Sequence, residues 1–309
     1  MPFRPLHVAS VSALMMLSAL TIPLLAEPPA AGLQSARVER IHRYRMSGRI
    51  RPFLVWMGRD NVGLARVTWR DEAGHRGYDL LIGTDPGRAP RGINRWGFVS
   101  EQGTGEGGDL LALMAGSVVG SFAEANRDTA DTASGARLRV LRGRLASGVT
   151  QGRVSQLVFP ELPSVHDLDE VLTRLGYEEA TAQPAVGRAA ADARPGLLTA
   201  LADLVEHLTA AAGRSDAALS DAARRRVAYV FGRESYALAL RSAQRATVDG
   251  LAGGKIRAVE AEYEIVTAST NARTRFEMTT GLDGDLAGVP LSVRWQPRWW
   301  LEVGLHLEE

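Results

Sequence analysis

Near the C-terminus, apolar and acidic residues alternate strictly, a pattern that only an extended strand with one buried face accommodates. Three glutamates separate four apolar residues there, which are Val259, Ala261, Tyr263 and Ile265. Successive side chains of a strand point to opposite faces, so the apolar set is expected to face a core and the glutamates to face water. Three shorter runs of the same kind follow. We therefore predict a four-stranded antiparallel meander over residues 251–309.

Residues 27–160 are expected to be β-rich for the same reason. Short alternating runs from Val38 onward are separated by clusters of Gly, Pro, Asp and Asn, which are typical turn residues. Asp60 and Asn61 lie between two glycines in one such predicted turn. The exception is the apolar run 110–122, for which Asp109 provides a helix cap.

Residues 161–250 are expected to be mainly helical, because their apolar residues recur at intervals of three and four instead of alternating. One helix is predicted to begin at Ser164 and to end at Gly176, and a second to run from Pro195 to Gly213. A third is predicted from Ser220 to just before Gly250, with an apolar stripe made of Val227, Val230, Phe231 and Leu238. The span 180–194 shows no clear period and is expected to be a link.

Together these elements predict an α+β fold. We expect a curved antiparallel sheet or partly closed β-barrel built from the N- and C-terminal strands, with the helical segment packed on it. Each strand set alone is small and the C-terminal set has no second layer of its own, so residues 27–309 are interpreted as a single domain. The alternative is two domains that divide near Pro160.

The first 26 residues have the features of a secretory signal peptide. Arg4 and His7 precede the uncharged apolar segment 8–26, and a Pro-rich stretch follows. We place cleavage after Ala26, with cleavage near Ala30 or Ala31 as an alternative and an uncleaved anchor as another. The mature protein is then expected to be periplasmic or secreted, and to have no transmembrane segment.

The net charge bears on the partners of the protein, and its cysteine content bears on how the fold is stabilised. The 309 residues include 36 Lys and Arg against 35 Asp and Glu, which gives a net charge of +1 and no reason to expect nucleic acid as a partner. The chain has no cysteine. An exported protein without disulfides depends on the packing of a large core for its stability.

Signatures of common enzyme classes are missing from the sequence. None of the six histidines lies in a zinc-binding arrangement, so no metal is expected. There is no Gly-x-Ser-x-Gly elbow and no phosphate-binding loop, and no cofactor is expected. Whether the protein is an enzyme stays open at this level.

Three polar residues are weak catalytic candidates. Glu234 lies on the apolar stripe of the third predicted helix, where burial would raise the pKa of its carboxyl group. His166 stands beside two aspartates at a predicted helix start, and Asp60 is a further carboxylate in a turn. Each also has a simpler interpretation as a solvated or ion-paired surface residue.

Aromatic residues of the C-terminal strands provide the ligand-binding hypothesis. Three of the six tryptophans fall within six residues, and we expect a cavity for an apolar or aromatic ligand. The residues proposed to line it are Tyr263, Phe276, Trp295 and Trp300. Arg91 and Arg95 form a second candidate, a pair of guanidinium groups able to hold an anion.

The leading hypothesis is therefore an exported protein that binds an apolar small molecule in a β-rich cavity. Two alternatives remain open. One is a periplasmic hydrolase of unfamiliar type that uses Glu234 or His166 with Asp60. The other is a structural, envelope-associated protein whose partner is another envelope protein.

Overall fold

The computed structural model describes residues 37–51, 56–72, 75–104, 109–117, 136–146, 149–159, 164–167, 183–188, 192–231, 234–250 and 253–308. The predicted signal peptide with its cleavage site and most of the helix predicted after Ser164 lie outside these ranges.

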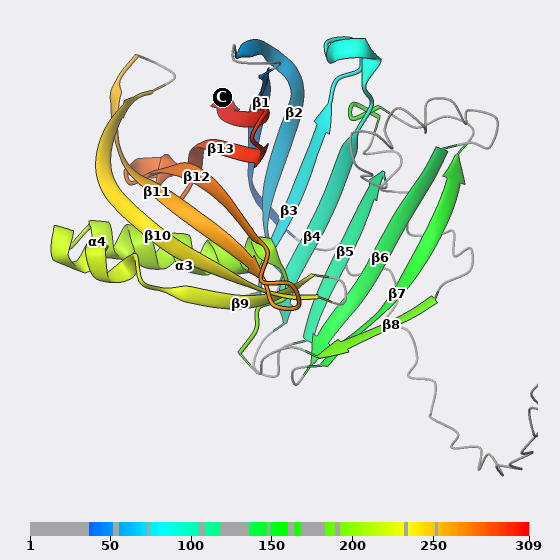
Figure 1. Cartoon of the computed structure of the whole chain (residues 1–309). Coiled ribbons are helices and arrows are strands. Elements are labelled where there is room, and N and C mark those ends of the chain that lie inside the picture. Colours follow the sequence, from blue (N-terminus) through cyan, green and yellow to red (C-terminus); the bar gives the residue numbers. More distant parts are fainter. Residues whose placement is uncertain are drawn as a thin grey trace, which may run out of the picture.

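Across the described residues, fourteen strands form one antiparallel sheet (Figure 1). Their bounds are β1 Arg37–Ile50, β2 Met57–Glu72, β3 His75–Thr84, β4 Trp96–Thr104, β5 Asp109–Ser117, β6 Ala136–Ala146, β7 Val149–Phe159, β8 Gln183–Arg188, β9 Arg226–Phe231, β10 Glu234–Asp249, β11 Lys255–Thr267, β12 Arg273–Gly281, β13 Pro290–Arg298 and β14 Leu301–Glu308. The strand order is β8-β7-β6-β5-β4-β3-β2-β1-β14-β13-β12-β11-β10-β9. The sheet curves without closing, because β8 and β9 at its two edges do not pair with each other.

The first and last strands of the described chain are neighbours at the middle of the sheet. β1 and β14 pair antiparallel, with Tyr44 opposite Leu307 and Ile50 opposite Leu301. This pairing confirms that N- and C-terminal strands share one curved antiparallel sheet. The four C-terminal strands β11 to β14 also form where the alternation predicts them.

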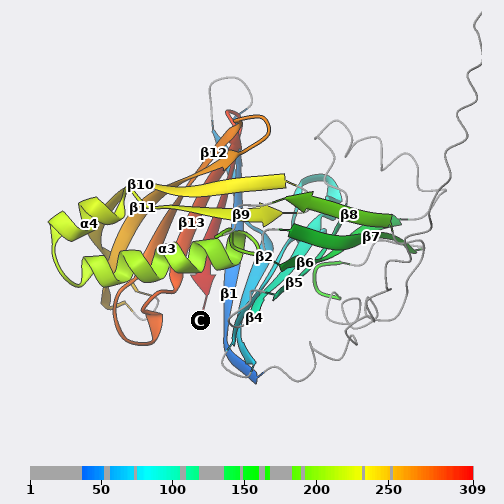
Figure 2. The same ribbon diagram turned by 90° about the horizontal axis from the view of Figure 1, so that it is seen from below.

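Two α-helices, α3 Leu197–Ala212 and α4 Asp216–Ala222, pack on one face of this sheet (Figure 2). α3 contacts β9, β10 and β11 and also β3 and β4, so it bridges the two arms of the curved sheet. Its side chains Leu204 and Leu208 are completely buried. The helix predicted between Pro195 and Gly213 is therefore confirmed. Within the described ranges, no helix has both the length and the apolar character that crossing a membrane requires.

The third predicted helix is wrong, since its residues form β9 and β10. Val227 and Leu238, which share the predicted helical stripe, are opposite each other across these two strands. The sequence of β9 also buries Tyr229, and a six-residue run in which most side chains are apolar fits the spacing of a helix and of a strand equally well.

Three smaller expectations also differ from the structure. The apolar run behind Asp109 is strand β5, paired with β4 and β6, because a continuous apolar run fits a buried strand as well as a helix. The span 180–194 includes β8. The turn predicted around Asp60 is a bulge within β2, where Asn61 adopts a left-handed φ of 59°.

The largest core cluster lies between the two helices and strands β9 to β12. Tyr263 and Phe276 stack there with ring centroids 4.9 Å apart and an interplanar angle of 6°. A smaller cluster continues along the same face of the sheet, and its buried members are Tyr44, Ala65, Val289 and Leu307. The opposite face of the C-terminal strands carries the glutamates and arginines, as the alternation predicts.

Candidate functional site

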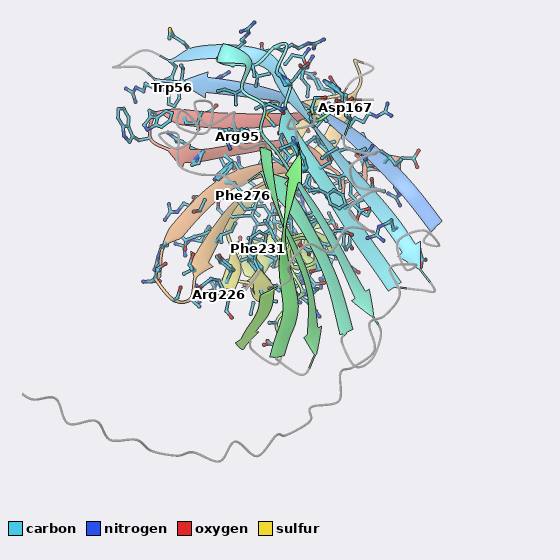
Figure 3. The ribbon with its side chains drawn as sticks, turned by 90° about the vertical axis from the view of Figure 1, so that its right-hand side faces the viewer. Trp56, Arg95, Asp167, Arg226, Phe231 and Phe276 are labelled. Atoms are coloured by element: carbon cyan, nitrogen blue, oxygen red, sulfur yellow. The ribbon has the colours of Figure 1, made fainter. Side chains whose placement is uncertain are left out.

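Exposed apolar side chains gather at one end of the sheet. Among the residues whose side-chain burial the structure describes, which do not include those of β5 to β8, seven large hydrophobic residues are exposed. Five of them belong to the ends of β1, β2 and β13 and the turn after β13, and we refer to these five as the aromatic tip: Ile50, Trp56, Met57, Trp295 and Trp299. Trp56 lies at the outer margin of the molecule in Figure 3, away from Phe276 in the core.

The strand register brings these residues together. Ile50 is opposite Met57 on β2 and opposite Leu301 on β14. The backbone N–H of Arg51 donates a hydrogen bond of 2.8 Å to the carbonyl oxygen of Trp300. The end of the β1–β2 pair is thus joined to the turn that carries Trp299.

The tip is the uncovered end of the core face. Ile50 shares a face with Tyr44 of β1, because the two residues are an even number of positions apart, and Trp295 is opposite Val303 on that same face. Further along, this face is covered by α3, which packs mainly on β9 to β11, β3 and β4. At the tip Trp295 is 41% exposed and Trp299 is 68% exposed. A packed apolar face therefore ends in an open aromatic surface.

Arginine is interleaved with these aromatic side chains. The guanidinium carbon of Arg51 lies 5.9 Å from the ring centroid of Trp56, within the range of a cation–π contact. Arg59 is exposed on β2 opposite Gly48, two positions from Ile50 on the same face. The tip thus combines indole rings with positive charge.

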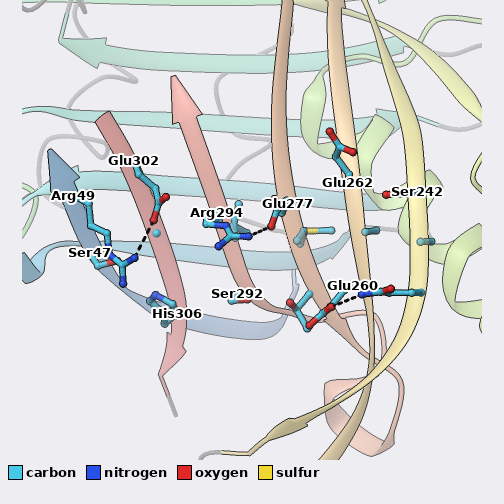
Figure 4. Close-up of a pocket in the computed structure, with 17 residues that line it drawn as sticks. Ser47, Arg49, Ser242, Glu260, Glu262, Glu277, Ser292, Arg294, Glu302 and His306 are labelled. Atoms are coloured by element: carbon cyan, nitrogen blue, oxygen red, sulfur yellow. Dashed lines mark hydrogen bonds and ion pairs between the residues drawn. The ribbon is translucent and has the colours of Figure 1, made fainter. Parts of the chain in front are cut away.

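A second candidate is a polar trough on the other face of the sheet (Figure 4). It is a hollow of about 550 Å³ over β1 and β10 to β14. Its charged lining residues and its histidine are Arg49, Glu260, Glu262, Glu277, Arg294, Glu302 and His306.

The charges of the trough are largely paired with one another. Arg49 lies 3.7 Å from Glu302, and Arg294 pairs with Glu277, which raises the pKa of the Arg294 guanidinium by hydrogen bonding. Gln244 donates a 2.9 Å hydrogen bond to Glu260. Such cross-strand pairs stabilise a water-facing sheet and do not require a ligand.

In the part of the chain that the structure describes, no group of three or more His, Asp or Glu side chains is placed to hold a metal ion.

The three catalytic candidates lie on different elements. Glu234 is exposed at the start of β10 and accepts a 2.6 Å hydrogen bond from the hydroxyl of Ser269. The side chain of His166 is 53% exposed, with its Nε2 3.4 Å from an oxygen of Asp85. Asp60 is exposed in the bulge of β2. No hydrogen bond or ion pair joins any two of these candidates in the described part of the chain.

The residues proposed to line an apolar cavity are separated by the fold. Tyr263 and Phe276 are in the core, where Tyr263 is fully buried and Phe276 is 9% exposed. Trp295 is at the aromatic tip, and Trp300 is half-buried beside it.

The two candidate arginines lie in the connection between β3 and β4. Arg91 falls in a short 3-10 turn, η2 Pro90–Gly92, and its side chain lies outside the described part of the structure. Arg95 is half-buried, and its backbone N–H donates 2.8 Å to the hydroxyl of Thr84. Because the side chain of Arg91 is not described, the structure leaves the proposed anion site as a prediction.

Sequence reasoning missed most of the aromatic tip. Of its five residues, only Trp295 is among those proposed from the sequence. A usable signal was present, since Trp56 and Trp299 each lie next to the end of a strand, where a side chain has fewer neighbours to cover it. Comparison with protein families, with curated proteins and with solved structures finds no match to this chain.

Proposed function

We propose that this protein is an exported, envelope-associated binding protein that attaches reversibly to a lipid surface through the aromatic tip. The observation that carries the proposal is the gathering of five exposed large hydrophobic side chains at one end of the sheet, out of seven among the residues whose side-chain burial is described. A contiguous apolar patch of this kind is typical of an interaction surface.

A lipid surface fits the chemistry of the tip better than an enclosed apolar cavity does. Tyr263 and Phe276 fill the space between sheet and helices with their own stacked rings. Tryptophan, in contrast, is enriched at membrane–water interfaces, because its ring is apolar and its N–H is a hydrogen-bond donor. Trp56, Trp295 and Trp299 offer three such rings at one end of the molecule.

The expected strength is that of reversible attachment. Complete burial of a large apolar side chain contributes about 1.5–3 kcal/mol. The tip side chains range from 38% exposed at Trp56 to 68% exposed at Trp299. Transfer of the five exposed portions therefore provides on the order of 4–8 kcal/mol before the cost of immobilising the protein.

Co-sedimentation with phospholipid vesicles tests this proposal. The protein is purified from a bacterial envelope fraction, and the Trp56→Ala/Trp299→Ala double variant is compared with it. We expect the double variant to lose most vesicle binding, together with the blue shift of tryptophan fluorescence that accompanies insertion. Both proteins have the same N-terminus, so a difference between them originates at the tip.

Two exposed residues away from the tip serve as controls. Ile41 is 51% exposed on β1, nine positions and about 30 Å from Ile50, and Phe231 is 39% exposed on β9. Ile41→Ala and Phe231→Ala should bind vesicles like the unaltered protein. If these controls lose as much binding as the tip variant, or if the unaltered protein does not bind vesicles, the proposed attachment is wrong.

Export is the second part of the proposal and has its own test. The basic, then apolar, then Pro-rich order of residues 1–29 supports it. We expect the protein recovered from the envelope or the medium to begin near Glu27. An intact mass that still includes Met1 would contradict a cleaved signal.

A further inference from the structure

We propose that the aromatic tip selects anionic phospholipids, and that Arg51 and Arg59 are the residues that make the selection. This inference rests on the proposed attachment to lipid, and it adds the class of headgroup that the tip binds.

Arg59 is exposed and Arg51 is half-buried, and neither guanidinium group makes an ion pair in the described ranges. No hydrogen bond joins the side chain of Arg59 to another residue of the described part. Arg51 is fixed by its backbone hydrogen bond to Trp300, and its guanidinium lies over Trp56 without an ion pair in the described ranges. The indole ring of Trp56 and the positive charge of Arg51 therefore lie next to each other at the tip.

No ion pair in the described ranges neutralises these two arginines. Asp60 and Glu302 are the acidic residues nearest to the tip along β2 and β14. Asp60 lies in the bulge of β2, and no ion pair joins it to Arg51 or Arg59 in the described ranges. Glu302 is paired with Arg49 in the polar trough on the other face of the sheet. The aromatic tip thus carries two arginines that no described ion pair neutralises, although the whole chain has a net charge of only +1.

Indole rings and guanidinium groups occupy adjoining depths of a bilayer. An indole at the interface places a neighbouring arginine at the level of the phosphates, and a guanidinium matches phosphate oxygens with two parallel hydrogen bonds. Attraction to a negatively charged surface adds to these bonds and increases binding about fivefold for each basic residue near the surface. Two arginines then predict a preference of roughly 25-fold for anionic over zwitterionic lipid.

A second copy of the chain is a less suitable occupant of the same surface. A two-fold symmetric dimer would place the tip against itself. Arg51 and Arg59 would then face the same arginines of the other copy, and like charges at an interface oppose association. An anionic lipid surface relieves the repulsion that self-association would create.

The test compares vesicles of phosphatidylcholine alone with vesicles that also contain phosphatidylglycerol, using the protein purified from the envelope. We expect roughly 25-fold tighter binding to the anionic vesicles at low salt, with most of the preference lost at high salt. The Arg51→Gln/Arg59→Gln double variant should lose the preference and retain its binding to phosphatidylcholine. Arg59→Gln alone, at an exposed side chain, should lose about fivefold on anionic vesicles.

The matched control is Arg224→Gln, an equal change of charge at an exposed position between α4 and β9. It should leave the preference unchanged. Equal binding of the unaltered protein to both kinds of vesicle, or an equal loss in Arg224→Gln and Arg59→Gln, would overturn the inference. Equal binding to both kinds of vesicle that still depends on Trp56 and Trp299 would contradict the lipid selectivity and leave the proposed attachment to lipid intact. Absence of binding to either kind of vesicle would contradict both proposals.

Discussion

Glu101 on β4 accepts hydrogen bonds from both the backbone N–H and the hydroxyl of Thr199, at 2.8 and 3.0 Å. It also accepts a 3.0 Å hydrogen bond from the backbone N–H of Leu198. The first N–H groups of a helix have no partner within the helix, and here one buried carboxyl group provides two of the missing acceptors. Because α3 otherwise packs mainly on β9 to β11, this contact fastens it to the other arm of the sheet.

Removal of the Thr199 hydroxyl should destabilise the fold. Thr199→Val keeps the shape of the side chain and deletes a hydrogen bond to a carboxyl group that is only 1% exposed. We expect a loss of about 1.5–3 kcal/mol in the free energy of unfolding, measured by urea denaturation. Thr199→Ser retains the hydroxyl and should lose clearly less. Equal losses in the two variants would show that the hydroxyl contributes nothing.

Glu101 should also make stability depend on pH. Burial raises the pKa of its carboxyl group, and the hydrogen bonds from Leu198 and Thr199 offset this only in part. The folded protein therefore retains a proton that the unfolded chain releases at a pKa of about 4.3. Stability from this group is present below that pH and is lost as the pH rises through the higher folded pKa.

The measurement is the unfolding free energy of the unaltered protein minus that of Glu101→Gln, followed across this pH range. This difference should decrease as the pH rises, because the unaltered protein loses stability and the glutamine of the variant does not titrate. A difference that is constant with pH, or that increases as the pH rises, would show that the pKa of Glu101 is not raised.

Gly196 should tolerate no side chain. A Cβ atom at this position would lie 2.2 Å from the Cδ and Oε1 atoms of Glu101. The φ of Gly196 is −169°, an extended value that any residue adopts, so the obstacle is steric alone. Gly196→Ala should cost about 1–3 kcal/mol by displacing Glu101 from the start of α3. Gly97→Ala, where no atom lies within 4 Å of the added carbon, should change the unfolding free energy much less.

Sequence reasoning succeeded where one periodicity was unambiguous. The alternation from Val259 to Ile265 predicts β11, because charged residues at every second position exclude a buried helix. The stripe that includes Leu204 and Leu208 predicts α3 for the corresponding reason. It failed at β9 and β10, where Val227 and Leu238 fit a helical repeat and are in fact cross-strand neighbours.

The site was harder to predict than the fold. The aromatic tip needs residues from opposite ends of the chain, and only the register of β1 with β14 brings Ile50 next to Leu301. The sequence predicts that such strands share a sheet, whereas their register depends on contacts between side chains distant in sequence. The partnership of Glu101 with α3 is another contact between distant segments, which no local pattern of residues reveals.

The buried hydroxyl group of Tyr263 destabilises the core. Tyr263 is fully buried and stacked on Phe276, and its hydroxyl oxygen has no hydrogen-bond partner among the described residues. A buried polar group without a partner costs about 1–3 kcal/mol, and burial raises the pKa of this phenol as well. Tyr263→Phe keeps the stacked ring and removes the hydroxyl, so the free energy of unfolding should stay level or increase by about 1 kcal/mol. Tyr263→Ala removes the ring and should lose about 3–5 kcal/mol in the same urea titration. A clear loss in Tyr263→Phe would mean that the hydroxyl has a partner in solution and that the core is more polar at this point than its packing indicates.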